Sequence, residues 1–312
     1  FQNISTSMIN FLHTHIPNPL LVNIGGVTIH WYGFLIVLGF LCGLIVALRL
    51  AKKYGLDPKV LYDLSFYGLI FGLIGDRTYY VIYAWEYYRE NPLDIVKIWE
   101  GGLAIHGGIT AGLIVFLVYA KKSKTLNDWL AAIQEKKIAL PANKKRHWFL
   151  YFFFLIDLAV VILLSGLAFG RWGNYFNQEL FGKPTELAWG IPIEPRFRPD
   201  EYKTATYFHP TFLYESVADL VLVATLVFLH TRRLKKNLAG KFSAYYFGNI
   251  ALFGLGGYSI IRFFNEFLRI DYSPTVFNLR VAQPVSLVLL LVVITVFFLK
   301  KRFFQQHGVQ KK

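Results

Sequence analysis

Three side chains that together can hold a phosphate recur at helical spacing late in the chain. Tyr258, Arg262 and Glu266 are separated by four residues each, which places them on one face of an α-helix. An arginine on such a face can bind a phosphate through two parallel hydrogen bonds, and a neighbouring glutamate can orient its guanidinium. The same spacing fits a structural arginine–glutamate pair at a membrane surface, so spacing alone favours neither interpretation.

A second polar cluster occupies residues 170–182, at the end of a long apolar run. Arg171, Asn174 and Glu179 lie within nine positions, and glycines such as Gly182 let the backbone approach a ligand closely. This density exceeds what a turn requires. It favours a binding site over the alternative, a polar helix end closed by a glycine.

His106 stands among glycines at the start of another apolar run. A neutral imidazole can accept a proton from a reacting group near neutral pH. An isolated histidine is more often a helix cap or a packing residue, so His106 alone does not establish a catalytic site.

Other polar residues lie within or beside the apolar runs. Asp76 and Arg77 precede three tyrosines, and Asp157 lies in the run that leads to residue 170; we interpret the acids as internal counter-charges to arginines. Tyr32 lies at the outer edge of the first run, where interfacial aromatic residues are common. A charge at the centre of a membrane helix costs about 2.5–3.5 kcal/mol, so such groups are expected to face a partner or a cavity.

These residues must be positioned by helices that cross a membrane. Uncharged runs such as 29–48 are long enough for a bilayer, which takes about 20 residues. Breaks at glycine, proline and charged residues divide the chain into spans. The seven expected spans are 29–48, 60–84, 103–120, 148–169, 211–230, 243–266 and 282–299.

The composition predicts an all-α polytopic membrane protein. Of 312 residues, 55% are hydrophobic and 17% charged, with a mean hydropathy of +0.42, whereas about a quarter of a soluble domain is charged. The net charge of +14 does not indicate nucleic-acid binding, because the basic residues cluster between apolar runs. Alternate loops and the tail carry 22 of the 33 lysines and arginines, the other loops 8, which places the N-terminus outside and the C-terminus in the cytoplasm.

We expect a single transmembrane domain over 1–312 with two larger loops. Residues 121–147 form a cytoplasmic basic insert, as a helical hairpin or a flexible loop, and residues 182–210 form an extracytoplasmic cap segment. The single cysteine, Cys42, excludes an internal disulfide and a cysteine-based metal site. We expect no cleavable signal peptide, because the first span can serve for insertion.

Taken in order, these segments resemble the prolipoprotein diacylglyceryl transferase family over about 29–299. The matching elements are Trp31-Tyr32-Gly33, Gly75-x-Arg77, His106-Gly107-Gly108, Gly170-Arg171-x-Gly173-Asn174-Tyr175-x-Asn177-x-Glu179-x-x-Gly182, His209-Pro210-x-x-x-Tyr214-Glu215 and Tyr258-x-x-x-Arg262-x-x-x-Glu266-x-x-Arg269. The chain departs from the family pattern at Tyr175, where phenylalanine is usual, at Gln178, where glycine is usual, and in its longer 121–147 insert.

The resemblance implies a transfer reaction in the bacterial cytoplasmic (inner) membrane. The diacylglyceryl group of phosphatidylglycerol passes to the lipobox cysteine thiol of a preprolipoprotein, which forms a thioether and releases glycerol phosphate. This is the first step of lipoprotein maturation. The implied partners are phosphatidylglycerol, the lipobox peptide and membrane lipid, with no nucleic acid, no metal and no organic cofactor.

The resemblance also assigns roles. We expect His106, Arg171 and Arg262 to be catalytic, with the arginines holding the leaving phosphate and His106 taking the thiol proton. The expected substrate-binding residues are Tyr32, Arg77, Asn174, Glu179, Gly182, Tyr258, Glu266 and Arg269. A transporter or channel for an anionic solute is the alternative reading, and a different transferase acting on phospholipid headgroups is a second.

Overall fold

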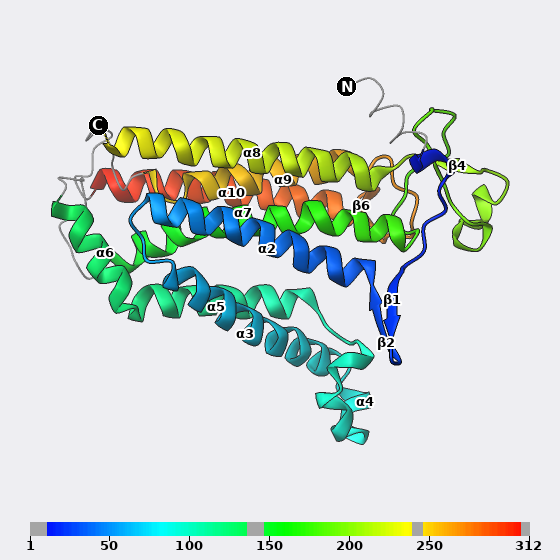
Figure 1. The fold of residues 1–312 in the computed structure, drawn as a ribbon, viewed down its shortest axis with the longest axis horizontal. Helices are drawn as coiled ribbons and strands as arrows, with labels where there is room; N and C mark the ends of the chain where they lie inside the picture. The colour runs from blue at the N-terminus through cyan, green and yellow to red at the C-terminus, as the bar shows by residue number, and fades with distance from the viewer. Residues whose placement is uncertain (1–10, 136–146, 239–245, 307–312) are drawn as a thin grey trace. The chain divides into compact units, whose positions relative to one another are not determined.

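The computed structural model of the chain is mostly helical and describes residues 11–135, 147–238 and 246–306. Among the described residues, one long helix overlaps each of the seven expected ranges (Figure 1). These helices are α2 (Trp31–Lys53), α3 (Lys59–Tyr83), α5 (Ile105–Lys122), α7 (His147–Phe176), α8 (Thr211–Leu238), α9 (Asn249–Asn265) and α10 (Ala282–Gln306). Within the described residues, α2, α7, α8 and α10 are long and apolar enough to cross a membrane by length and composition. The protein is therefore a helical membrane protein.

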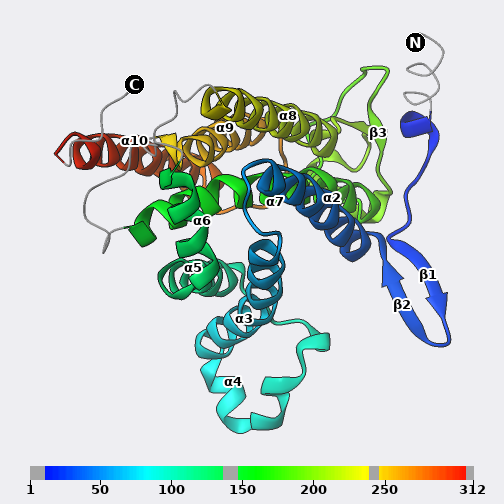
Figure 2. The ribbon, with the colours of Figure 1, turned by 60° about the vertical axis from the view of Figure 1, so that its left-hand side comes forward.

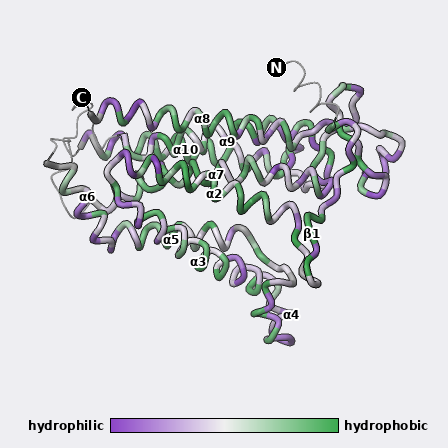
Figure 3. The backbone as a smooth tube through the Cα atoms, viewed as in Figure 1, coloured by the Kyte–Doolittle hydropathy of each residue, from purple (hydrophilic) through white to green (hydrophobic). Residues whose placement is uncertain are grey.

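The observed helix ends have local causes. Asp57 accepts a hydrogen bond from the backbone N–H of Lys59 (2.9 Å) at the start of α3. Helix α7 continues to Phe176, beyond the expected end at 169, so residues 170–176 of the polar motif are helical. It stops where Gln178 and Leu180 take positive φ angles of 52° and 57°. Figure 3 shows hydrophobic residues running along α2, α7 and α8.

The chain divides into two compact units, which are described separately. The first comprises residues up to 47, 157–235 and 248–303; the second comprises 48–156 and 236–247, with the residues after 303. The prediction of one transmembrane domain stays a prediction.

Close helix packing in the first unit depends on glycine. A Cβ atom at Gly43 of α2 would lie 2.7 Å from the Cα of Ile162 in α7, so only glycine fits there. Deeper in the unit, the fully buried Asp157 pairs with Arg233 (2.7 Å) and accepts hydrogen bonds from the N–H groups of Gly248 and Ala251. Asp157 is thus part of an internal pair, as the sequence favoured, and it also caps the start of α9.

Short strands lie between the helices of the first unit. Strands β1 (Leu20–Ile24) and β2 (Val27–His30) form an antiparallel hairpin ahead of α2. Strands β5 (Thr275–Val276) and β6 (Leu279–Arg280) form another before α10. In the cap, β3 (Ile191–Pro192) pairs with β4 (Tyr207–Phe208).

The cap has a small apolar core of its own. Leu12, Tyr175, Phe181, Ile191, Ile193, Phe208 and Phe212 are buried together there. The segment 182–210 therefore packs on both the end of α7 and residues near the start of the described chain. This packing fixes the backbone immediately after the polar motif.

The second unit is organised by α3 and α5, which lie next to each other in Figures 1 and 2. A Cβ atom at Gly75 would lie 2.6 Å from the carbonyl oxygen of Gly107, so the two backbones touch. Asp76 accepts a hydrogen bond from the N–H of Gly108 (2.7 Å), and its own carbonyl accepts one from Ala104. Asp76 therefore fixes the first turn of α5, the turn that carries residue 106.

The basic insert begins as a helix, α6 (Lys124–Glu135). Its Trp129 is buried, donates a hydrogen bond to the carbonyl of Tyr54 (3.1 Å) and stacks on Phe154. Residues 136–146, where the second half of the expected hairpin falls, lie outside the described residues.

Candidate active site

Two arginines from different helices share one carboxylate in the first unit. Glu215 of α8 is 2% exposed; its Oε1 lies 2.6 Å from Nη2 of Arg171 on α7, and its Oε2 lies 3.5 Å from Nη1 of Arg262 on α9. Asn265 donates a further hydrogen bond to Oε2 of Glu215 (2.8 Å). The structure therefore brings together the two arginines that the sequence predicted as catalytic.

Both arginines retain donors that can serve a ligand. Among the described residues, Nε of Arg171 and Nη1 of Arg262 are buried and make no hydrogen bond, although Nη1 of Arg262 has the long ion-pair contact with Glu215. Arg171 also donates to the hydroxyl of Tyr258 (3.4 Å), which joins α9 to the same cluster. Buried guanidinium donors are costly when unsatisfied, so this pair is suited to an anionic group that enters beside Glu215.

Glu266 is the second carboxylate of the cluster and receives three arginines. Its oxygens lie 2.9 Å from Arg262, 3.5 Å from Arg269 and 2.7 Å from Arg280. Arg269 and Arg280 both also bind Asp271, at 2.8 Å and 3.2 Å. Arg262 and Glu266 are in contact, as their spacing predicted, and the role of Glu266 in orienting Arg262 for a substrate stays a prediction.

Asp219 extends the cluster by one helical turn from Glu215. It is fully buried, and neither of its carboxylate oxygens has a hydrogen-bond partner among the described residues. Four carboxylates, those of residues 215, 219, 266 and 271, thus accompany four arginines, those of residues 171, 262, 269 and 280. Three of these carboxylates, those of residues 215, 266 and 271, form ion pairs with the arginines, which lowers the cost of burying them.

The glycine-rich motif after Arg171 presents an exposed carboxylate. Asn174 and Asn177 both donate to Oε1 of Glu179, at 2.9 Å and 3.1 Å. Gly182 is buried, and a Cβ there would lie 2.8 Å from Cβ of His209, so glycine permits close packing of this loop. The two asparagines therefore orient Glu179, whereas the position of Gly182 is set by packing.

Tyr32 from α2 lies directly against the same motif. A Cβ added to Gly173 would lie 2.4 Å from the Tyr32 ring, and Trp31 stacks on Phe176 with ring centroids 4.4 Å apart. The Trp31–Tyr32 pair and the end of α7 are thus one packed surface, with Tyr32 still 40% exposed.

Arg77 and His106 belong to the second unit. Arg77 is buried and donates to the carbonyl oxygens of Ile95 (2.8 Å), Gly101 (2.7 Å) and Asp94, so it holds the loop before α5. This loop contains α4 (Trp85–Glu90) and the short 3-10 turns η1 (Pro92–Val96) and η2 (Ile98–Glu100). His106 is exposed in the first turn of α5, and its ring centroid lies 5.8 Å from that of Tyr79.

His209 and Glu194, near the cap, have shifted pKa values. Burial, with a smaller contribution from Lys183, lowers the pKa of His209, whose Nδ1 lies 3.1 Å from the hydroxyl of Tyr214. A hydrogen bond from Gln178, assisted by Arg196, lowers the pKa of Glu194. His209 thus favours the neutral form and Glu194 the ionised form, which keeps the Gln178 contact charge-assisted.

Five members of the cluster had no role predicted from the sequence. These are Glu215, Asp219, Asn265, Asp271 and Arg280. Glu215 and Asp219 did carry a signal, because acids one turn apart inside an apolar run are costly without cationic partners. Arg280 carried none, since it lies in a short hairpin far from the helical motif.

Apolar helices of membrane length and a buried arginine–carboxylate cluster define a helical membrane protein with a charged site inside its first unit. Comparison with known proteins specifies the family. The sequence model described as prolipoprotein diacylglyceryl transferase matches residues 19–299. The chain belongs to this family.

Similar proteins support the same assignment. A phosphatidylglycerol–prolipoprotein diacylglyceryl transferase of Trichormus variabilis is 40% identical over 277 residues, which is 89% of this chain and 87% of that protein. Proteins of the same name from Thermotoga maritima and Staphylococcus aureus are each 38% identical, over 88% and 89% of this chain and 82% and 87% of their own lengths.

Proposed function

We propose that this chain transfers the diacylglyceryl group of phosphatidylglycerol to the lipobox cysteine thiol of a preprolipoprotein. The thiol sulfur forms a thioether with the glycerol carbon, the carbon–oxygen bond to phosphate breaks, and glycerol phosphate leaves. Family membership and the names of the relatives support this activity. We place the enzyme in the bacterial inner membrane with seven spans, the N-terminus outside and the C-terminus in the cytoplasm.

The observation that carries the proposal is a pair of buried guanidinium nitrogens beside Glu215 that make no hydrogen bond within the described residues. Among the described residues, the buried Nε of Arg171 makes no hydrogen bond, and the buried Nη1 of Arg262 has only a long ion-pair contact with Glu215 (3.5 Å). As the carbon–oxygen bond breaks, negative charge grows on the phosphate oxygens, and donors fixed in advance stabilise that charge more than the uncleaved ester. Glu215 holds the two donors together before substrate arrives.

The attacking thiol must lose its proton. A free cysteine thiol has a pKa of about 8.5, and the thiolate is the nucleophile, so a base raises the reactive fraction near neutral pH. We assign this role to His106, which is exposed on the first turn of α5.

The remaining predicted residues fall into two groups. Tyr258 and Glu266 orient the arginines, and the carboxylate of Glu179, held by Asn174, faces the headgroup or peptide. Tyr32, Gly182, Arg77 and Arg269 shape the backbone around the substrates, because each is engaged in packing or in contacts with protein groups. Direct substrate contact by this second group stays a prediction.

One assay tests the activity. Purified protein is incubated with phosphatidylglycerol and a lipobox peptide, and the peptide is weighed by mass spectrometry. We expect a mass increase of one diacylglyceryl unit. Flux of an anionic solute through reconstituted vesicles without peptide modification would instead support a transporter and overturn the proposal.

Lysine substitutions test the arginine pair. Arg171→Lys and Arg262→Lys keep the charge but lose the forked donor geometry, so we expect transfer to fall by about a hundredfold or more in each. Initial rates with the lipobox peptide provide the measurement. Arg196→Lys, at a position whose side chain is 70% exposed, is the matched control and should transfer at the normal rate. Near-normal rates in the first two variants would exclude the phosphate-clamp role.

A glutamine at position 106 tests the base. His106→Gln keeps hydrogen bonding but cannot take a proton, so the rate should rise with pH until the thiol itself ionises. We expect the variant to approach the parent rate at alkaline pH. An unchanged pH–rate profile would remove the base role and leave a hydrogen-bonding one.

A further inference from the structure

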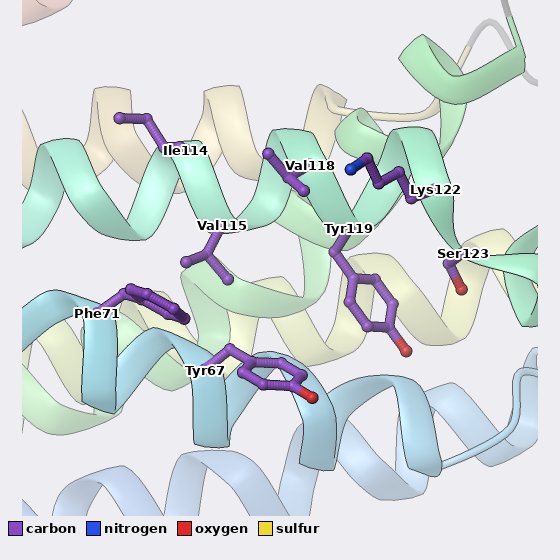
Figure 4. Close-up of a pocket in the computed structure, with 8 residues that line it drawn as sticks. All are labelled: Tyr67, Phe71, Ile114, Val115, Val118, Tyr119, Lys122 and Ser123. Atoms are coloured by element: carbon purple, nitrogen blue, oxygen red, sulfur yellow. The ribbon is translucent and has the colours of Figure 1, made fainter.

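An apolar groove with one charged end lies between α3 and α5, on residues that the transfer chemistry does not use. It has a volume of about 490 Å³. Its lining is Tyr67 and Phe71 of α3, Ile114, Val115, Val118, Tyr119 and Lys122 of α5, and Ser123. Figure 4 shows Val115 and Tyr119 pointing from α5 toward the two aromatic rings of α3. Of these lining residues, only Lys122 is charged.

Helical spacing explains why the charge lies at one end. Ile114, Val118 and Lys122 follow at intervals of four residues, so they form one row along α5. Two apolar positions therefore lead to an ammonium group at the last turn of the helix. Ile114 is 54% and Val118 is 47% exposed, so this row is open to the surroundings.

The charge near this end is predominantly positive. Lys121 and Lys124 are exposed on either side of Lys122. Two acids lie near the lining: Asp63, whose Oδ2 accepts a hydrogen bond from the Tyr119 hydroxyl (2.9 Å), and Asp57, which interacts with Tyr119 electrostatically. Because three lysines outnumber these two aspartates, an anion fits this end better than a cation or a neutral headgroup.

We propose that the groove binds an anionic phospholipid of the cytoplasmic leaflet. One acyl chain lies between α3 and α5, and the phosphate contacts the ammonium of Lys122. The inference rests on the membrane orientation given under the proposed function, which places the last turn of α5 at the cytoplasmic surface, where anionic lipids gather. It does not depend on the transfer reaction.

Photocrosslinking in nanodiscs tests this site. The probes are phosphatidylglycerol and phosphatidylcholine that carry the same diazirine-labelled acyl chain, each diluted into phosphatidylcholine discs. Crosslinked peptides are mapped by mass spectrometry. We expect the peptide that contains residues 114–122 to be labelled about fivefold more by the anionic probe, since a lysine at the surface favours an anionic lipid by roughly that factor.

Three variants distinguish recognition of the lipid headgroup from binding of the acyl chain. Lys122→Gln should abolish the anionic preference, whereas Lys121→Gln, outside the lining, should retain most of it. Val118→Trp should reduce labelling by both probes because it fills the groove. Equal labelling by the two probes in the parent protein, or equal effects of the two lysine variants, would overturn the proposal. Peptide transfer is measured on the same samples, so an inactive enzyme with intact labelling would count against the transferase and not against the lipid site.

Discussion

Glu215 links side chains that no short motif connects. It lies 44 residues after Arg171 and 47 before Arg262, yet it bonds to both. A carboxylate between two guanidinium groups removes most of their mutual repulsion and fixes their separation. A phosphate is also an anion, so it competes with Glu215 for the guanidinium donors of the two arginines. When a phosphate binds, the contacts between these arginines and Glu215 must lengthen, or the donors must serve both anions.

Replacing Glu215 by glutamine should therefore impair the site more than a surface change of the same kind. Glu215→Gln leaves two buried arginines with less opposite charge, at a cost of about 3–5 kcal/mol. We expect kcat/KM for peptide transfer to fall by about a hundredfold or more. Steady-state rates with the lipobox peptide and phosphatidylglycerol check this.

Glu186→Gln, at an exposed position of the cap segment, is the matched control. It should leave kcat/KM unchanged. If Glu215→Gln transferred as fast as the parent protein, Glu215 would have no part in positioning the arginines.

Gln178 has an unfavourable backbone conformation, but its side chain makes several hydrogen bonds to distant residues. Its φ of 52° is a conformation that favours glycine, the residue usual for the family at this position. Its side chain donates to the carbonyl of Pro17 (3.0 Å) and to Glu194 (2.9 Å), and it accepts from the N–H of Glu194 (2.8 Å). Three hydrogen bonds of about 1 kcal/mol each offset a backbone strain of similar size.

At the scale of elements, the contact between α3 and α5 sets where His106 lies. A Cβ at Gly107 would lie 2.1 Å from the carbonyl oxygen of Gly75, which is backbone and cannot move aside alone. Asp76 then fixes the next N–H of α5. The first turn of α5 is thus held by two independent backbone contacts.

A methyl group at this contact should displace the helix. We expect Gly107→Ala to lower the midpoint of thermal unfolding in detergent, because overpacking costs about 1–3 kcal/mol, and to slow transfer through the shift of residue 106. Gly72→Ala on α3 is the matched control, since a Cβ there meets nothing within 4 Å. This variant should keep or raise the midpoint temperature, because alanine stabilises a helix by up to about 1 kcal/mol relative to glycine. Equal midpoints for the two variants would contradict the close contact.

The helices were predictable from sequence because each expected span is a run of apolar residues with its own ends. Among the described residues, each of the seven expected ranges overlaps one long helix, and the ends differ most at the C-terminal ends of α7, α8 and α10. At α7 the apolar signal ends at 169, but hydrogen bonding continues through the polar motif to Phe176. Hydropathy reports burial in lipid, not the helical state of a polar segment.

Spacing could reveal contacts only between neighbours along one element, whereas the joint role of Arg171 and Arg262 was predicted from the family resemblance. Arg262 lies on α9 and Glu266 directly follows its end, so spacing revealed their contact. Glu215 and Arg280 come from other elements, and a pairing across elements leaves no period in the sequence. Arg77 resembles a ligand-binding arginine by type, yet its donors go to loop carbonyls, which sequence could not specify.

At the scale of the whole molecule, the uneven distribution of basic residues predicts one orientation. Twenty-two of 33 lysines and arginines lie on the side assigned to the cytoplasm. The cap segment 182–210 and the start of α6 are therefore expected on opposite sides of the membrane.

The single native cysteine makes this orientation measurable. In a Cys42→Ser background, Glu201→Cys in the cap should react with a membrane-impermeant maleimide on intact spheroplasts. Lys124→Cys at the start of α6 should react only after permeabilisation. Gel-shift labelling with and without detergent provides the measurement, and the reverse pattern would invert the proposed topology.

The start of the described chain has a consequence for the order of assembly. Leu12 is buried in the cap core, His13 stacks on Tyr207 with ring centroids 4.0 Å apart, and Pro17 accepts from Gln178. These residues are synthesised before their partners near 175–212, which follow some 160 residues later; at about 5–20 residues per second this interval is on the order of ten seconds. Residues 12–17 must therefore wait until the surface that binds them has been synthesised. Residues 12–17 are thus synthesised before the cap core but can pack into it only after residues 175–212 are in place.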